Sequence, residues 1–326
     1  MNSRPITASR VAVRPGDDEL DMFGMTHQGH RRANNQDHFL IATIHAEIKV
    51  HSASLSGIAE LPLLGNRLGT VLLVADGVGG TSDGAAAAQL ATESVMQYVA
   101  SSLRCYHEMS TGNDPQFLSS LRETALRAHE AVLAEAATRS DRASLATTLT
   151  LGLGVWPWLY VVQVGDSRAY IYSGKRLVQV TRDQTMAQEM VDMGALKAED
   201  MPRSPLNDIL SSAIGAEDAS PVVTRVDVSE RGCVLLFCTD GLTKHVSDAE
   251  IEAHCAMGTT AERLGRTLVD LALERGGSDN ITIVIAQAPL KTRATRSPRW
   301  HSCAHLPRHF LRQPVAASMS WLRARI

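Results

Sequence analysis

Four aspartates in this chain stand at the ends of apolar segments, each beside glycine or another small polar residue. Asp76 and Asp240 follow short apolar runs, in V-A-D-G-V-G-G and F-C-T-D-G-L-T, and Asp166 and Asp279 occupy Q-V-G-D-S-R and G-S-D-N-I-T. Strand ends hold side chains rigidly, and carboxylates gathered there repel one another unless cations neutralise them. If these segments meet in space, the pattern predicts a cation site.

The chemistry of the candidate ligands indicates which cation would bind. All of them are oxygen donors, and no Cys or His cluster with zinc spacing is present, so Mg²⁺ or Mn²⁺ is expected. Gly77 has no side chain to block its carbonyl, which can add a ligand beside Asp76. For any one Asp-Gly pair a simple turn is the alternative, because both residues are typical of turns.

A further polar stretch reads Arg32-Ala-Asn-Asn-Gln-Asp37. The Arg32 guanidinium can bind a phosphate through two parallel hydrogen bonds, and Asp37 can add a carboxylate near the cations. Taken alone, the stretch fits a solvated loop equally well.

The elements that must position these residues follow from apolar periodicity. Residues 84–104 and 117–137 have helical spacing, and residues 248–254 and 261–274 are expected to form shorter helices. Short connections between strands predict antiparallel hairpins, including one that joins 221–228 to 233–238, and residues 182–220 are expected to form a surface flap. The order predicts an α+β domain of antiparallel sheets with helices packed outside. The expected strands are 70–75, 145–155, 159–164, 168–172, 221–228, 233–238 and 281–286.

Composition divides the 326-residue chain into three parts. Residues 1–20 are expected to form a loose arm, residues 21–290 one domain, and residues 291–326 a basic extension with eight Lys or Arg and no acid. Residues 1–290 then carry 24 basic and 35 acidic residues, a net charge of −11, which argues against general nucleic-acid binding. Five cysteines without paired spacing, no signal peptide and no apolar run of 18 residues predict a cytoplasmic protein without a transmembrane segment.

Taken together and in order, these motifs resemble those of the PPM (type 2C) metal-dependent protein phosphatases in their bacterial form. The resemblance covers residues 22–288. The matching segments are Arg32-Ala-Asn-Asn-Gln-Asp37, Asp76-Gly77-Val78-Gly79-Gly80, Gly165-Asp166-Ser167-Arg168, Thr239-Asp240-Gly241-Leu242 and Asp279-Asn280-Ile281-Thr282.

The resemblance implies a β-sandwich of two antiparallel sheets flanked by helix pairs, in α-β-β-α layers. It implies a serine/threonine phosphatase that uses water activated by two Mn²⁺ or Mg²⁺ ions and antagonises a bacterial Ser/Thr kinase. Asp76 would bridge the two metals, with the Gly77 carbonyl on one and Asp240 and Asp279 on the other. Three further roles are implied: Asp166 would hold a third metal, Asp37 would hold metal-bound waters, and Arg32 would bind the substrate phosphate.

Two departures from the family pattern affect the expected chemistry. His27 stands where many members carry Asp and is expected to support the Arg32 loop, and Val78 stands where some members carry a histidine as general acid. The residue that protonates the leaving group is therefore not indicated. Two other functions stay open: a degenerate relative that only binds phosphoproteins, and an enzyme for a regulatory phosphoprotein such as an anti-sigma antagonist. The basic extension could dock an acidic partner or be an unstructured tail.

Overall fold

The computed structural model describes residues 14–47, 64–79, 82–101, 115–139 and 145–288. The chain divides into two units, 1–290 and 291–326. The predicted basic extension and residues 1–13 of the predicted arm lie outside the described residues. Among the helices of the described segments, none is long and apolar enough to cross a membrane.

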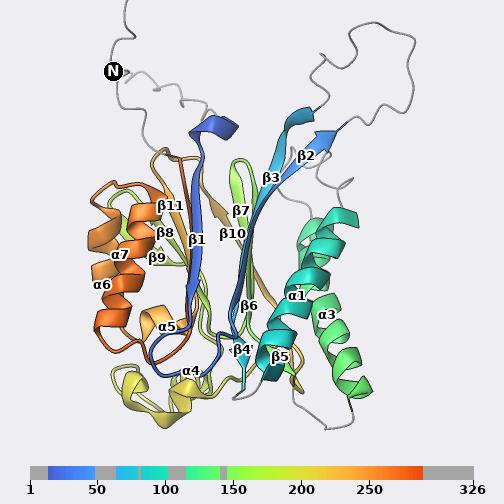
Figure 1. Ribbon diagram of the computed structural model, residues 1–326, viewed down its shortest axis with the longest axis vertical. Helices are drawn as coiled ribbons and strands as arrows, with labels where there is room; N and C mark the ends of the chain where they lie inside the picture. The colour runs from blue at the N-terminus through green and yellow to red at the C-terminus, as the bar shows by residue number, and fades with distance from the viewer. Residues whose placement is uncertain (1–13, 48–63, 80–81, 102–114, 140–144, 289–326) are drawn as a thin grey trace, which may run out of the picture. The chain divides into compact units, whose positions relative to one another are not determined.

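Two five-stranded antiparallel sheets form the centre of the first unit (Figure 1). The first sheet has the order β1 (Asp21–His27), β12 (Ile281–Gln287), β11 (Val234–Cys238), β8 (Arg168–Ser173) and β9 (Arg176–Gln179). The second has the order β10 (Val222–Asp227), β7 (Trp158–Val164), β6 (Leu149–Val155), β3 (Leu64–Ala75) and β2 (His38–Glu47). The short strands β4 (Gly77–Val78) and β5 (Ala146–Thr147) pair separately.

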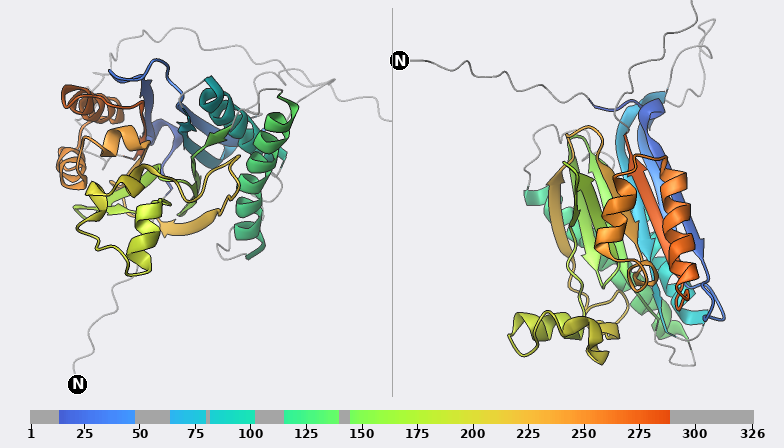
Figure 2. Two further views of the ribbon diagram at one scale, coloured as in Figure 1. Left: turned by 90° about the horizontal axis from the view of Figure 1, so that it is seen from below. Right: turned by 90° about the vertical axis from the view of Figure 1, so that its left-hand side faces the viewer.

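Helices cover the outer face of each sheet, as Figures 1 and 2 show. The second sheet packs against α1 (Ser82–Ser101) and α3 (Pro115–Thr138), and the first against α6 (Asp248–Cys255) and α7 (Ala261–Glu274). In α7 the buried Leu264, Leu268 and Ala272 recur every four residues and so form one apolar face. These layers confirm the predicted α-β-β-α fold.

Three apolar layers hold the fold together. One lies between the second sheet and α1 and α3, one between the first sheet and α6 and α7, and one between the two sheets, where Leu72, Phe237 and Val284 meet. The central strands are apolar on both faces because each face packs against another layer. Burial of this surface is the main driving force for folding.

The predicted hairpin that joins residues 221–228 to 233–238 is wrong. β10 pairs with β7 in the second sheet, whereas β11 pairs with β12 and β8 in the first. The turn at 165–167 likewise carries the chain from β7 in one sheet to β8 in the other. A short connection shows only that two strands lie near each other. It can join neighbouring strands of one sheet as a hairpin, or it can join strands of two sheets that pack face to face.

Several elements differ from the sequence prediction in extent. Strands β1 and β2, which flank the Arg32 stretch, were not predicted, and β3 begins six residues before the expected residue 70. The flap contains α4 (Met186–Asp192) and two short 3-10 helices, Met201–Arg203 and Pro205–Asp208.

The described end of the predicted arm packs against β3. The buried Arg67 of this strand donates a hydrogen bond to the Pro15 carbonyl at 2.9 Å and pairs with Asp17 at 2.9 Å. Residues 14–20 are therefore attached to the domain rather than extending away from it.

Candidate active site

The predicted site residues meet at one end of the β-sandwich, because the strands that carry them end there. In the first sheet His27 pairs with Ile281 and Cys238 pairs with Arg168. In the second, His38 pairs with Ala75 and Leu149 pairs with Val164. This register places Asp37, Asp76, Asp166, Asp240 and Asp279 at the same edge of the two sheets. A cleft there is lined by Arg32 and four of the aspartates, and also by Gln36, Thr148, Asp208, Lys244, His245 and Ser278.

The backbone of Asp76 is fixed by two threonines from the neighbouring strands. Its N–H donates to Thr148 Oγ1 at 3.0 Å, and its carbonyl accepts from Thr147 Oγ1 and from the Thr148 N–H, both at 2.8 Å. Gly77 comes next, and a Cβ there would lie 2.4 Å from the Gly84 backbone at the start of α1. A side chain at this position would therefore force β4 and α1 apart and move Asp76.

Asp166 stands in the turn that crosses from one sheet to the other. Gly165 precedes it with φ of +101° and donates its N–H to Gln184 Oε1 at 2.7 Å, which ties this turn to the start of the flap. Ser167 follows and is fully buried, with its Oγ 2.8 Å from Thr148 Oγ1. The serine is thus part of the framework and is inaccessible to a substrate.

Asp37 is buried and held by two hydroxyl groups. Its Oδ2 accepts from Thr239 Oγ1 at 2.8 Å and from Thr282 Oγ1 at 2.7 Å, whereas its Oδ1 has no hydrogen-bond partner among the described residues. Burial raises the pKa of Asp37 to about 7, although both threonines oppose the rise, and Asp240 and Asp279 add to it.

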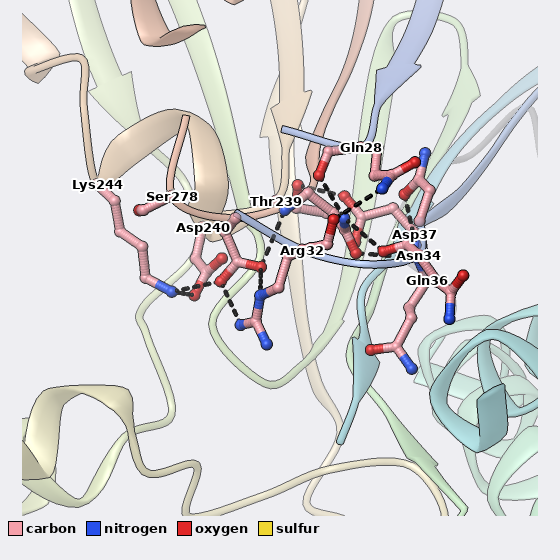
Figure 3. Close-up of polar contacts among 12 residues, drawn as sticks. Gln28, Arg32, Asn34, Gln36, Asp37, Thr239, Asp240, Lys244 and Ser278 are labelled. Carbon is pink, nitrogen blue, oxygen red and sulfur yellow. Dashed lines mark hydrogen bonds and ion pairs between the residues drawn. The ribbon is translucent and has the colours of Figure 1, made fainter. Parts of the chain in front are cut away.

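Asn280 fixes the loop that carries Arg32 and Asp37. Its Oδ1 accepts from the Gln36 N–H at 2.9 Å, and its Nδ2 donates to the carbonyls of Gln28 at 2.8 Å and Asn34 at 3.0 Å (Figure 3). His27 accepts a 2.9 Å hydrogen bond at Nδ1 from the N–H of Gly29 in the same loop, in keeping with its expected supporting role.

Two glycines allow three backbone segments to approach one another at Asp279. A Cβ at Gly29 would lie 2.1 Å from the Asp279 carbonyl oxygen, and a Cβ at Gly241 would lie 1.9 Å from the Asn280 carbonyl oxygen. Gly29 also has φ of +77°, which L side chains rarely adopt. Larger residues at these positions would displace Asp279 from the cleft.

Two side-chain cations engage the carboxylates of the cleft (Figure 3). Arg32 binds Asp279 with both ends of its fork, Nε to Oδ1 at 2.6 Å and Nη2 to Oδ2 at 2.8 Å. Lys244 Nζ lies 2.6 Å from Asp240 Oδ2 and 2.9 Å from Asp279 Oδ2. Burial alone would raise the pKa of Asp279, but the hydrogen bonds and charges of Arg32 and Lys244 lower it.

The other carboxylates are less well compensated. Burial, reinforced by repulsion from Asp37 and Asp240, raises the pKa of Asp76 well above its ordinary value. Burial also raises the pKa of Asp240, against the opposing charge of Lys244, and raises the pKa of Asp166 to about 8. The cleft therefore concentrates negative charge that protons or cations must neutralise.

The donor set fits a divalent cation, but the carboxylates are not gathered around one point. The oxygens are hard ligands, and Oδ1 of both Asp37 and Asp240 is buried without a hydrogen-bond partner among the described residues. Within those residues no group of three or more His, Cys, Asp or Glu side chains already encloses a metal position. Asp240 and Asp279 are instead held by Lys244 and Arg32, so a cation that bound both carboxylates would have to open these three ion pairs.

Sequence reasoning missed four residues that shape the site: Thr239, Asn280, Thr282 and Lys244. Three of them lie inside the motifs T-D-G-L and D-N-I-T, within three residues of an aspartate, so the motifs themselves carried the signal. Lys244 stands four residues after Asp240, a spacing that brings side chains together on a helical turn. That spacing was the available sign that an ion pair forms at Asp240.

Comparison with known proteins shows that this chain is similar in sequence to serine/threonine phosphatases. The serine/threonine protein phosphatase PstP of Mycobacterium tuberculosis is 32% identical over 216 residues, which is 66% of this chain and 40% of PstP. The chain thus matches less than half the length of that relative. The serine/threonine phosphatase stp of Listeria monocytogenes is 27% identical over 220 residues, 68% of this chain and 85% of stp.

Solved structures agree with the sequence comparison. A crystal structure of M. tuberculosis PstP superposes with a TM-score of 0.65 at 27% identity, covering 83% of this chain and 99% of that one. The PstP catalytic domain in complex with two manganese ions superposes with a TM-score of 0.62 at 27% identity, covering 82% and 97%. The family model of protein phosphatase 2C matches residues 65–274. From its motifs, its fold and these matches, the chain belongs to the protein phosphatase 2C family.

Proposed function

We propose that this chain hydrolyses phosphoserine and phosphothreonine in proteins and depends on divalent cations to do so. The observation that carries the proposal is the convergence of Asp37, Asp76, Asp166, Asp240 and Asp279 at one edge of the sandwich, beside Arg32. Five carboxylates in so confined a place destabilise the protein unless protons or cations neutralise them, which is typical of a functional site. PstP, a serine/threonine phosphatase whose catalytic domain binds two manganese ions, supports the choice of reaction and cofactor.

In this proposal Asp76, the Gly77 carbonyl, Asp240 and Asp279 hold two Mn²⁺ or Mg²⁺ ions. Asp166 contributes to a third ion, and Asp37 orients water near the metals. When bound, these cations would activate a water molecule for attack near neutral pH and would neutralise charge on the phosphoryl oxygens. The threonines around the Asp37 carboxylate and the Asp76 backbone keep these two residues in place, which lowers the cost of assembling the site.

Arg32 is proposed to bind the substrate phosphate. Its side chain is 46% exposed at the cleft, and its fork already makes two charge-assisted hydrogen bonds to a carboxylate. A phosphate group offers the same pair of acceptor oxygens with more negative charge. Arg32 can therefore give up its two hydrogen bonds to Asp279 and form two to the substrate phosphate with the same arrangement of N–H donors.

No side chain of the described residues is assigned as the nucleophile or the general acid. Ser167 is buried, and His245, although it lines the cleft, accepts a hydrogen bond at Nε2 from the Ser278 N–H at 2.9 Å. The reaction is therefore expected to proceed by direct attack of water on phosphorus.

The test is release of phosphate from a phosphothreonine peptide with Mn²⁺, Mg²⁺ or EDTA, for wild type and Asp240→Asn. Wild type is expected to require the cation, and Asp240→Asn to lose at least about 100-fold in kcat, since a metal ligand is removed. Asp270→Asn, on the exposed face of α7, is the control and should keep full activity. No turnover with any divalent ion by folded wild type would overturn the proposal and favour a phosphoprotein-binding function.

The remaining parts of the proposal concern partners and location. We expect phosphoproteins as substrates, a cognate bacterial Ser/Thr kinase as the opposing enzyme, and the cytoplasm as the site of action. Support comes from the bacterial phosphatases to which the chain is similar. Docking of the basic residues 291–326 to an acidic partner stays a prediction from the sequence.

A further inference from the structure

Lys244 occupies an unusual position for a surface lysine. Its Nζ lies 2.6 Å from Asp240 Oδ2 and 2.9 Å from Asp279 Oδ2, so one ammonium group bridges two carboxylates from different segments. Its side chain is 32% exposed, and those of Asp240 and Asp279 are 20% and 12% exposed. Ion pairs this sheltered are screened much less by salt than pairs on an open surface.

The local backbone keeps Lys244 near these carboxylates. Asp240 begins the short helix α5 (Asp240–Thr243), and the Lys244 N–H donates to the Asp240 carbonyl at 2.8 Å. The lysine therefore stays on the helical turn that carries one of its partners. A cation that binds Asp240 and Asp279 meets a fixed positive charge within reach of the same oxygens.

We propose that Lys244 is an internal counter-cation that competes with divalent cations for Asp240 and Asp279, and so sets the metal concentration that this protein requires. The inference rests on the proposed function, in which these two aspartates are metal ligands. In the metal-free protein the ammonium group neutralises the pair of carboxylates. Metal binding must first break both Lys244 contacts, which costs free energy. It then leaves the lysine charge close to the bound cation, and the repulsion between the two positive charges lowers metal affinity further.

Arg32 also pairs with Asp279, but it engages only one of the two carboxylates. It contacts Asp279 but not Asp240, and it comes from the loop before β2, so it can turn toward a phosphate in the cleft. Lys244 is the residue among the described cations that joins the two predicted ligands to each other. Its removal should therefore change metal affinity without removing a ligand.

The experiment measures Mn²⁺ binding directly, through the electron paramagnetic resonance signal of free Mn²⁺, in the full chain after treatment with EDTA and dialysis. Lys244→Met is expected to lower the Kd for Mn²⁺ by about tenfold or more, because a positive charge beside the site is lost. Lys244→Arg keeps the charge and should stay within about threefold of wild type. Lys197→Met removes the same charge from an exposed flap residue whose Nζ lies 3.7 Å from Glu199, and should bind like wild type.

Circular dichroism in EDTA shows whether each variant is folded, and Lys244→Gln replaces Lys244→Met if that variant is not. If wild type binds Mn²⁺ and folded Lys244→Met binds it equally or more weakly, the inference about Lys244 is overturned and the proposed function is not. If Lys197→Met lowers the Kd for Mn²⁺ as much as Lys244→Met does, the inference is also overturned, because the change in net charge would then explain the effect. Absence of Mn²⁺ binding in all four proteins would overturn the proposed function and this inference together.

Discussion

Replacement of Asp37 by asparagine is expected to stabilise the metal-free protein at neutral and higher pH. Asp37 is 4% exposed, its Oδ2 accepts from Thr239 and Thr282, and its Oδ1 has no hydrogen-bond partner among the described residues. Asparagine can place its carbonyl oxygen where both hydroxyl groups donate, and it carries no charge. The substitution thus removes a buried charge and keeps the hydrogen bonds.

The size of the effect follows from the pKa of Asp37, which burial raises from 3.8 to about 7. A carboxyl group with a raised pKa binds its proton more tightly in the native state than in the unfolded chain. Its favourable effect is therefore complete below about pH 4 and is lost as the pH rises to 7. Each tenfold change in proton affinity corresponds to about 1.4 kcal/mol. The free energy of unfolding of the wild type therefore falls by about 4 kcal/mol over this pH range, and that of Asp37→Asn does not.

The assay is urea denaturation in EDTA at pH 5 and pH 8, for wild type, Asp37→Asn and the exposed control Asp270→Asn. The free energy of unfolding of Asp37→Asn relative to wild type should increase by about 3 kcal/mol between the two pH values, since most of the titration falls between them. The control should show little change. An Asp37→Asn protein that is less stable than wild type at pH 8, or a difference independent of pH, would refute the reasoning.

Three further outcomes are expected. Gly241→Ala places a Cβ 1.9 Å from the Asn280 carbonyl oxygen and should weaken Mn²⁺ binding by about tenfold or more, because the Asp279 segment must move. Gly152→Ala, with a Cβ 2.4 Å from Phe237 Cζ in the core, should instead lower stability by about 1–3 kcal/mol in urea denaturation while Mn²⁺ affinity is retained. Equal effects of both variants on Mn²⁺ affinity would contradict this assignment. The affinity for Mn²⁺ should rise from pH 6 to pH 8, because burial raises the pKa of Asp166 to about 8 and bound protons must leave. Calorimetry in buffers of different ionisation enthalpy measures this proton release, and pH-independent affinity would contradict it.

The candidate cation site could be predicted from the local sequence because it depends on residue type next to strand ends. Asp76, Asp166, Asp240 and Asp279 each follow or precede an apolar segment, and all are oxygen donors. The helices α1, α3, α6 and α7 were also predictable, since their apolar residues recur at helical spacing. Such properties are encoded within windows of a few residues to about twenty.

Strand pairing depended on the tertiary structure, because periodicity shows that a strand exists but not which strand it joins. The segment after β10 crosses to the other sheet, and so does the turn that carries Asp166, where hairpins were expected. Those crossings bring carboxylates from both sheets to one edge. The same applies to β1 and β2, whose register places Asp37 beside Thr239 and Thr282.

The sequence by itself determined which side chains can bind a cation, since that depends on their chemistry and on the motifs around them. The tertiary structure alone decided which charges oppose one another in the cleft. Arg32 and Asp279 are separated by 247 residues along the chain, yet they form a bidentate ion pair. Lys244 reaches Asp279 as well as its neighbour Asp240. Electrostatic interaction depends on distance in space and on burial, and both are fixed only when the two sheets pack together.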